Sequence, residues 1–336
     1  MRANKTSYID HVRWIRDAIL GRGGDFFIVG TTLKLAVRRL GVQWQLEPRF
    51  LDAVEDRVYT SPPELGVPLT GFAGWLPYAP RTWDLAQSCA LFRGFLREHS
   101  LPTPELHSTT PPFAGEVLVR RAGPASEAVL GPFATPAEHP LADGEAYETF
   151  LLGTRVRFWY WNGAPLCAEL QKMPTVVGDG SRSLRDLILE RATWSRPFSE
   201  EQEGALFARP SPLLSLQGHA LASPLAHGMR VIIDHALDSP LLHPSERQTF
   251  LVDGADEPAW LTTVRRAGDL LRSAAPPEFR SDLLFTVDAV FDRDEQLWLL
   301  EMNGNPIVHP ALYPAIIGTL FEHGIPSRAP TSEVSA

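Results

Sequence analysis

The stretch that decides the fold is LFTVDAVFDRDEQLWLLEMNGNP, residues 284–306. Its two apolar runs are separated by the charged turn Arg293–Glu295 and predict two paired strands. Asp288 lies in the first run, and Glu301 and Asn303 lie in the second. Alternate side chains of a strand share a face, so Glu301 and Asn303 project together. If the turn pairs the strands, Asp288 lies close to them across the ladder.

These three side chains place charge and polarity inside two apolar strands. Acidic groups inside apolar strands are costly unless they are paired or bound to a cation. Two carboxylates and an amide oxygen are ligands that suit Mg²⁺, an ion that also holds phosphates. From the spacing alone two interpretations stay open: a magnesium site, or carboxylates satisfied by arginines on a solvated face of the sheet.

Working outward, apolar runs and turn signals predict a mixture of strands and helices. A strand leading directly into a helix near the N-terminus indicates an α/β opening unit, and the Pro- and Gly-rich segment 60–80 is expected to be an irregular connection. Asn162-Gly163 predicts a tight hairpin turn. The expected strands are 26–30, 116–121, 147–152, 155–161, 165–171, 229–235, 283–292 and 296–303. The expected helices are 8–20, 31–41, 84–99, 183–192, 257–273 and 311–323.

Composition excludes several classes of protein. The 336 residues carry 31 Lys+Arg against 40 Asp+Glu, a net charge of −9, so nucleic-acid binding has no general electrostatic support. Cys89 and Cys167 are the only cysteines, too few for a disulfide scaffold or a four-thiolate zinc site, and both are expected to be buried. No run reaches the ~18 apolar residues of a membrane span. We expect a soluble, cytoplasmic protein without nucleic-acid or membrane partners.

Four segments, in order, carry a resemblance to known enzymes. Residues 288–306 resemble the signature that closes the catalytic domain of ATP-grasp enzymes. The segment YETFLLGTRVRFWYWNGAPLCAELQKMPTVVGDGSRSLRDLI (147–188) resembles the glutathione-synthetase-like module of bifunctional bacterial glutathione synthetases and the matching region of cyanophycin synthetases. LQGHALASPLAHGMRVII (216–233) and NPIVHPALYP (305–314) agree with the same families. The resemblance covers about residues 145–320.

The resemblance implies roles for individual residues. Magnesium or manganese ions bridging ATP phosphates would be held by Asp288, Glu301 and Asn303. Arg157 and Lys172 match residues that contact phosphate or the acyl intermediate. His309 matches a position that orients substrate, although a solvated histidine is the alternative. The hinge whose backbone holds adenine matches Glu148, Thr149, Phe150 and Leu151, with Glu148 at its mouth, and a loop closing over the active site matches Gly178, Asp179 and Gly180.

Four departures from the family pattern concern the nucleotide. The family has a lysine at the start of a helix, but the matching position here is near Asp84-Leu85 and holds no lysine. The family's second lysine lies on a strand, and its position here is occupied by Arg120 or Arg121. The glycine-rich loop is reduced to AGPASEA, residues 122–128, and an acidic residue expected to bind ribose is replaced by Arg155. Arginine presents a planar fork where lysine presents a point charge, so phosphate binding is expected to rest on arginines.

The resemblance implies an α/β (α+β) protein of ATP-grasp fold, with the nucleotide site between two α+β subdomains. The expected units are an N-terminal pre-ATP-grasp-like α/β domain (1–100), a reduced lid subdomain (101–160), a catalytic subdomain (161–326) and a disordered tail (327–336). The implied activity is an ATP-dependent carboxylate–amine ligase that forms an amide or peptide bond through an acyl phosphate. Its partners would be small-molecule carboxylate and amine substrates, with a homodimer as a further option. The alternatives are a nucleotide-binding regulatory protein without ligation and an ATP-grasp phosphotransferase.

Overall fold

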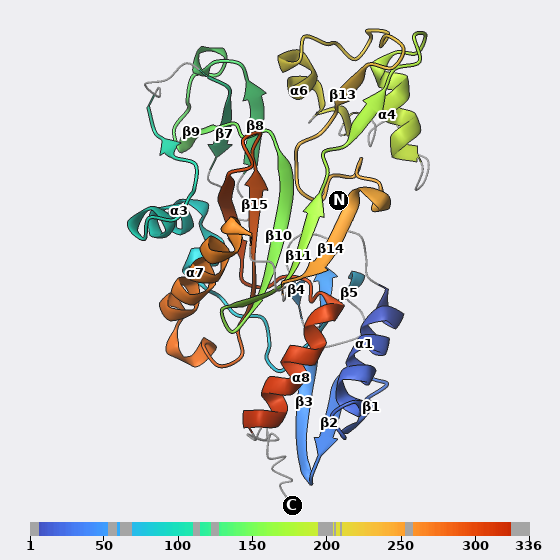
Figure 1. Ribbon diagram of the computed structural model, residues 1–336, viewed down its shortest axis with the longest axis vertical. Coiled ribbons are helices and arrows are strands. Elements are labelled where there is room, and N and C mark those ends of the chain that lie inside the picture. The colour runs from blue at the N-terminus through green and yellow to red at the C-terminus, as the bar shows by residue number, and fades with distance from the viewer. Residues whose placement is uncertain are drawn as a thin grey trace, which may run out of the picture.

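The computed structural model describes residues 7–52, 59–60, 69–109, 115–121, 128–193, 204, 206–208, 210–252 and 258–323. Helices and antiparallel sheets are mixed along the chain, so the expected α+β class is confirmed. Figure 1 shows a sheet at each end of the long axis and a central sheet between them. In the described part of the chain, no helix combines the length and apolar content that crossing a bilayer requires.

The N-terminal sheet is antiparallel throughout. Its strands are β1 (Asp25–Ile28), β2 (Leu35–Arg39), β3 (Val42–Asp52), β4 (Tyr59–Thr60) and β5 (Leu69–Leu76). The order is β1-β2-β3-β4, and β5 also pairs with β3. Two helices from opposite ends of the chain lie beside this sheet and contact each other, α1 (Tyr8–Leu20) and α8 (Tyr313–His323).

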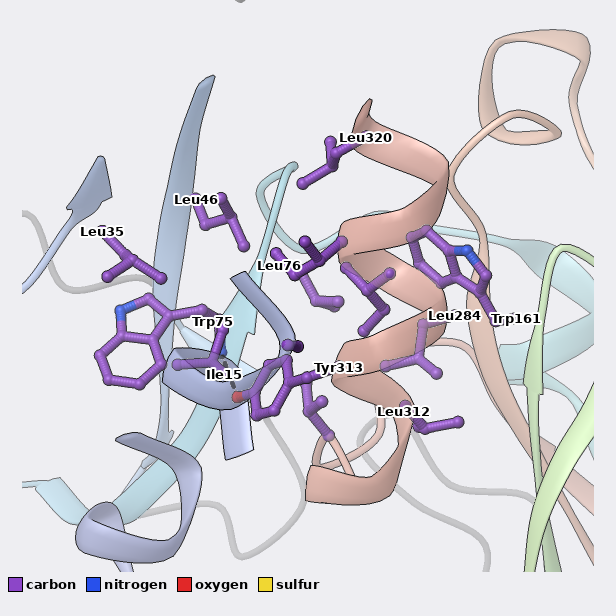
Figure 2. Packing of buried hydrophobic residues seen from close by; sticks show 14 of the residues in the cluster. Ile15, Leu35, Leu46, Trp75, Leu76, Trp161, Leu284, Leu312, Tyr313 and Leu320 are labelled. Atoms are coloured by element: carbon purple, nitrogen blue, oxygen red, sulfur yellow. Dashed lines mark hydrogen bonds between the residues drawn. The ribbon is translucent and has the colours of Figure 1, made fainter. Parts of the chain in front are cut away.

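One hydrophobic core joins this sheet to α8 (Figure 2). Ile15 of α1 and Trp75 of β5 are fully buried together with Tyr313 of α8. The Tyr313 hydroxyl accepts a hydrogen bond from the Trp75 backbone N–H at 3.1 Å, shown as a dashed line in Figure 2. The other labelled members of the cluster are Leu35, Leu46, Leu76, Trp161, Leu284, Leu312 and Leu320. Residues far apart in the sequence therefore stabilise one another.

The expected helix at 31–41 is wrong, and with it the α/β opening unit. Its second half is β2, which pairs antiparallel with β1 and β3. Leu40 and Gly41 have φ of +50° and +80°, the left-handed pair that turns a tight hairpin. Pairing within the sheet thus overrides the moderate helix propensity of these residues. The expected irregular connection at 60–80 is also partly wrong, because it contains β5.

The central sheet carries the motifs that the sequence singled out. Its order is β14-β11-β10-β15-β16, all antiparallel. The strands are β10 (Thr154–Trp161), β11 (Ala164–Gln171), β14 (Arg247–Leu251), β15 (Leu284–Phe291) and β16 (Leu297–Asn303). The predicted hairpin of 284–306 is therefore confirmed as β15 and β16. Helix α7 (Ala259–Ala274) packs on one face of this sheet, in a core with α3 (Cys89–Glu98).

A third sheet has the order β6-β9-β7-β8. Its strands are β6 (Leu106–His107), β7 (Val117–Arg121), β8 (Ala128–Phe133) and β9 (Glu145–Thr149). Beside it lies a small unit built from β12 (Thr175–Val177), α4 (Leu184–Thr193), α6 (Pro210–Leu216) and β13 (Arg230–Ile232). The short helices are α2 (Asp84–Gln87), η1 (Pro136–Glu138), η2 (Pro244–Glu246), η3 (Pro277–Phe279) and η4 (Pro310–Leu312).

Several expected boundaries differ from the structure. The helix expected over 84–99 is interrupted at Ser88, whose extended backbone ends α2 and whose side chain caps α3 by accepting from the Leu91 N–H at 3.2 Å. The domain boundary drawn at residue 160 falls inside β10, which pairs with β11 and β15 in one sheet. Cys89 and Cys167 are buried, as expected. The reduced glycine loop lies outside the described residues except for Ala128, and the C-terminal tail lies outside them entirely.

Candidate functional site

A row of charged residues crosses the central sheet. Glu169 of β11 lies opposite Arg157 of β10, which lies opposite Asp288 of β15, which in turn lies opposite Glu301 of β16. Directly opposed residues on adjacent strands have Cβ atoms about 5 Å apart. The strand pairing predicted from the sequence therefore brings Asp288 and Glu301 together, and it adds Arg157 beside them. We call these four residues the charged row.

Arg157 binds two carboxylates at once. Its Nε and Nη2 donate to the two carboxylate oxygens of Asp288 at 2.6 and 2.8 Å, and its Nη1 donates to Asp238 at 2.7 Å. Asp238 also accepts from Arg247 and Gln171, at 3.0 and 3.1 Å. Bidentate arginine–carboxylate pairs are directional as well as strong, so Arg157 is held in one orientation within the charged row.

The two carboxylates bound by Arg157 have opposite pKa shifts. Burial raises the pKa of Asp288 to about 6; Arg157 opposes this rise, while the nearby charges of Glu301 and Asp238 add to it. Burial acts on Asp238 in the same direction, but Arg157 and Arg247 hold the pKa of Asp238 down to about 2. Of the two, Asp288 is the carboxylate whose ionised form is less favoured, mainly because it is buried and secondly because Glu301 faces it. Such a pair of carboxylates gains most from a cation.

A second group of charges lies on the neighbouring sheet. Glu148 of β9 is buried between Arg120 of β7 and Arg93 of α3: Arg120 donates its Nε to Glu148, and Arg93 Nη2 lies 2.9 Å from the same carboxylate. Burial alone would lower the pKa of Arg120, but Glu148 raises it, and Glu301 adds to this rise. The two groups of charges therefore act on each other across the sheets, and we treat them as one site.

Arg155 lies between the two groups and is buried. It donates to the backbone oxygens of His235 at 2.7 Å and Leu151 at 3.3 Å. Burial lowers the pKa of Arg155 to about 10, and both Glu148 and Glu301 counteract that shift. The position where the family has a ribose-binding acid therefore carries a cation. This cation is hydrogen-bonded to Leu151 of the expected adenine hinge.

Backbone groups of the expected adenine hinge are hydrogen-bonded to other parts of the protein. The Phe150 N–H donates to the Glu116 backbone oxygen at 2.9 Å, and the Leu151 oxygen accepts from Arg155. The expectation that Glu148 stands at the mouth of this hinge is wrong, because its carboxylate is buried in the arginine pair. Thr149 and Leu151 are half-buried, and Phe150 is buried.

The loop around Gly178 is bound to the segment 225–229. The Gly178 N–H donates to the Met229 oxygen, and the Gly180 N–H donates to the Leu225 oxygen at 3.0 Å. A Cβ at Gly178 would lie 2.2 Å from a backbone oxygen, and Gly180 has a φ of +88°. Backbone N–H groups of Arg182 and Ser181 hold the pKa of Asp179 well below its usual range. These contacts hold the segment between β12 and α4 against 225–229, an arrangement that both a closed flap and a rigid turn would show.

The remaining expected residues do not join the charges directly. Arg121 lies on the other face of β7, where its Nε donates to Glu145 at 2.8 Å. Lys172 is exposed just beyond β11. The His309 ring lies near Trp159, with its Nδ1 3.5 Å from the sulfur of Cys167. Burial lowers the pKa of His309 to about 4, so the imidazole is neutral at pH 7. Trp159 and Cys167, which it contacts, are two residues along their strands from Arg157 and Glu169 of the charged row.

The donor set fits a divalent cation, and the hinge fits adenine poorly. Asp288 and Glu301 face each other, and Asn303 is two residues further along β16, although its oxygen accepts from the Asn305 N–H at 2.8 Å. Within the described residues no three His, Cys, Asp or Glu side chains form a ready metal site, so Asn303 would supply the third ligand. The arginines of the site suit phosphate groups: Arg157, Arg155, Arg120 and Arg93. To bind adenine, however, the hinge backbone would have to give up its present hydrogen bonds.

Three residues of the site were not expected. Arg93 lies one turn after Cys89 on the buried side of α3, and an arginine on an apolar helical stripe is a signal that could have identified it. Glu169 lies two residues from both Cys167 and Gln171 along β11, and strand periodicity puts these three side chains on one face, a signal that could have identified it. Asp238 follows β13 in a region without periodicity, and nothing in the sequence identified it.

Comparisons with known proteins were made with the chain and its structure. No family model matches the chain, and no curated protein does. The structure is similar to a bifunctional glutathione synthetase from Pasteurella multocida, with 14% identity, 95% of this chain and 44% of that one covered, and a TM-score of 0.45. It is also similar to the ATP-grasp ligase PsnB in complex with a minimal precursor (13% identity, 70% and 62% covered, TM-score 0.36).

A third similar structure is the D-alanine–D-alanine ligase from Bacillus anthracis, with 10% identity, 71% of this chain and 67% of that one covered, and a TM-score of 0.37. The chain spans 44% of the synthetase and 62% of PsnB. All three TM-scores lie below 0.5, and these likenesses assign no activity to the chain.

Proposed function

We propose that this protein is an ATP-dependent carboxylate–amine ligase. ATP would phosphorylate a substrate carboxylate, and an amine would then attack the resulting acyl phosphate and form an amide. A carboxylate cannot otherwise lose its oxygen at neutral pH, so the reaction is divided into two easier steps. The observation that carries the proposal is the charged row: two facing carboxylates, one with a raised pKa, surrounded by arginines in the middle of a sheet.

The residues of the site have distinct roles in this proposal. Asp288, Glu301 and Asn303 would hold Mg²⁺ or Mn²⁺, which when bound neutralises charge on the transferring phosphoryl group. Arg157 would keep Asp288 ionised and oriented, and its guanidinium lies where a developing negative charge can be stabilised. Arg120 and Arg93, which share Glu148, would offer positive charge to the nucleotide phosphates. The chain supplies no covalent nucleophile in this scheme.

The test is whether ADP release depends on two substrates. Purified protein would be incubated with Mg·ATP and a matrix of amino acids and dipeptides, and ADP and amide would be quantified in the same samples. A ligase releases ADP in equal amount to amide and only with both an acid and an amine present. Glu301→Gln serves as the inactive control.

A second candidate is a nucleotide-binding or regulatory protein without ligation. One observation favours it: the hinge backbone and Arg155 already satisfy one another. It predicts nucleotide binding by calorimetry with no ADP release for any pair of substrates. ADP release that needs one acceptor and no amine would instead identify a phosphotransferase.

A further inference from the structure

Arg49 of β3 is a buried cation without a negative partner. Its side chain is fully enclosed. Its Nη1 donates to the Asn305 side-chain oxygen and its Nη2 to the Tyr78 backbone oxygen, both at the long distance of 3.3 Å. Its Nε has no hydrogen-bond partner. No carboxylate of the described residues forms an ion pair with Arg49. The buried guanidinium charge therefore has two long hydrogen bonds and one N–H group, that of Nε, without a partner.

A second guanidinium makes this arrangement less favourable. The Arg81 guanidinium carbon lies 3.6 Å from the centre of the Tyr78 ring, and that of Arg49 lies 4.9 Å from the same ring. Burial lowers the pKa of Arg49, and the charge of Arg81 lowers it further. Arg81 donates only to backbone oxygens, those of Phe279 and Asp282, at 3.4 and 3.0 Å. Asp282 and Glu278 partly offset the lowering of the Arg81 pKa by burial. Among the described residues no carboxylate does so for Arg49, and enclosing a charge without an anion is strongly destabilising.

This arginine pair is connected to the charged row. The Asn305 side-chain oxygen accepts from Arg49 and from the Arg81 backbone N–H, while the Asn305 N–H donates to Asn303. Asn305 follows Glu301 by four residues, a span of at most ~14 Å in extended chain. Arg49 is therefore joined to the strand that carries Glu301 through the hydrogen bonds of Asn305.

We propose that Arg49, with Arg81 beside it, binds a carboxylate of a substrate other than the carboxylate that reacts. A carboxylate bonded side-on to Nε and Nη2 would satisfy the orphaned Nε. Binding requires the enclosed side chain to be uncovered and Nη2 to exchange the Tyr78 oxygen for the ligand. The inference rests on the proposed ligase activity only in calling the ligand a substrate. The carboxylate belongs to the acid substrate if that substrate has two, or to an amino acid that serves as the amine.

The first test measures binding without nucleotide. Thermal unfolding is recorded in about 100 mM acetate, a small carboxylate probe. The reference sample contains chloride at the same ionic strength. Acetate is expected to raise the Tm of the wild-type protein and of the control Arg38→Met, an exposed arginine on β2. It is expected to leave the Tm of Arg49→Met unchanged. Inorganic phosphate forms a third arm.

Ligand-free Arg49→Met should be at least as stable as the wild-type protein, because methionine of similar length removes an uncompensated charge. A clear fall in its Tm would show a structural role and overturn the proposal. So would an acetate shift that is equal in both proteins or absent from both, or a shift with phosphate alone. If Arg49→Met does not fold, Arg49→Lys decides: it should need at least ~10-fold more acetate for the same shift, since the fork is lost.

Turnover then identifies the source of the carboxylate. Arg49→Met should raise the KM of one substrate at least ~30-fold while kcat changes less than ~3-fold, as expected for an interaction made equally in ground and transition states. The affected substrate, acid or amine, carries the carboxylate, and an unchanged KM for both overturns the proposal. Absence of any turnover in the wild-type protein would refute the ligase function and leave the acetate result standing.

Discussion

The two faces of the central sheet are built from the same strands and serve different purposes. Val156, Phe158 and Tyr160 of β10 point to one face and are fully buried in a core under α7. Arg155 and Arg157 of the same strand point to the other face and bind carboxylates and backbone oxygens. The alternation of β10 thus places Arg155 and Arg157 opposite the core under α7, while further along their own face Trp159 and Trp161 are buried in the cluster shared with α8. Charged residues can be replaced on one face while the packing on the other face remains.

The first prediction removes a residue of the apolar face. Phe158→Ala should lower the free energy of unfolding by about 3–5 kcal/mol, because the lost transfer energy and the residual cavity add. Chemical denaturation measures this, with Phe158→Leu as a milder control. Nucleotide binding at a temperature where the variant is folded should be near that of the wild-type protein. A small loss of stability would contradict the division between the two faces.

The second prediction removes a charge from the opposite face. Glu301→Gln should lower turnover at least ~100-fold, an effect of roughly 2.7 kcal/mol on the barrier, because a neutral amide is a poorer ligand for a divalent cation. The Tm should change little, since the side chain keeps its size. Leu300→Ala on the same strand is the matched packing control. Normal turnover at saturating Mg²⁺ would remove Glu301 from the proposed metal site.

The third prediction extends the comparison to β7, where neighbouring arginines point to opposite faces. Arg120→Lys should weaken ATP binding about 10-fold, or roughly 1.4 kcal/mol, because the bidentate fork beside Glu148 is lost. Arg121→Lys should leave ATP affinity unchanged, because Arg121 pairs with Glu145 on the other face. Isothermal calorimetry measures both. Equal effects, or none from either variant, would place the phosphates elsewhere.

The smallest expected effect is a shift of a pH profile. Burial raises the pKa of Asp288 in the folded protein to about 6, above the usual range of an aspartate, so this group favours the folded state more as the pH falls from about 6 to 4. Metal binding needs the ionised form, so turnover should decline below about pH 6. Arg157→Gln removes the charge that lowers the pKa, so the acid limb should move to higher pH. A limb that does not move would separate Asp288 from the rate.

Much of the site was predictable because its strands follow simple rules. The pairing of Asp288 with Glu301 follows from two apolar runs and a short charged turn, and the register places them as the sequence predicts. Arg157 was expected from the motif, and its bidentate bond to Asp288 explains why it lies there. By contrast, Asp238 and Arg93 reach the site from segments whose position depends on tertiary packing, which local patterns do not encode.

The N-terminal half was predicted less well for a related reason. Residues 31–41 have moderate propensity for either helix or strand, and the neighbouring strands β1 and β3 decide between them. The loop at Gly178 was expected to be a flap. Its hydrogen bonds to 225–229 come from residues almost 50 positions away in the chain, so a local pattern of two glycines around an aspartate could not distinguish a flap from a fixed turn.

The packing of α8 on the first sheet has a consequence for how the protein folds during synthesis. The buried cluster that contains Ile15, Leu35 and Trp75 is closed by Leu312, Tyr313 and Ile316. At ~5–20 residues per second, a ribosome needs roughly 12–48 s to extend the chain from β5 to α8. During that interval the earliest sheet lacks its covering helix. This sheet is therefore made before the central sheet and completed after it, and chaperones that bind exposed apolar sheets would encounter it while the central sheet is still being made.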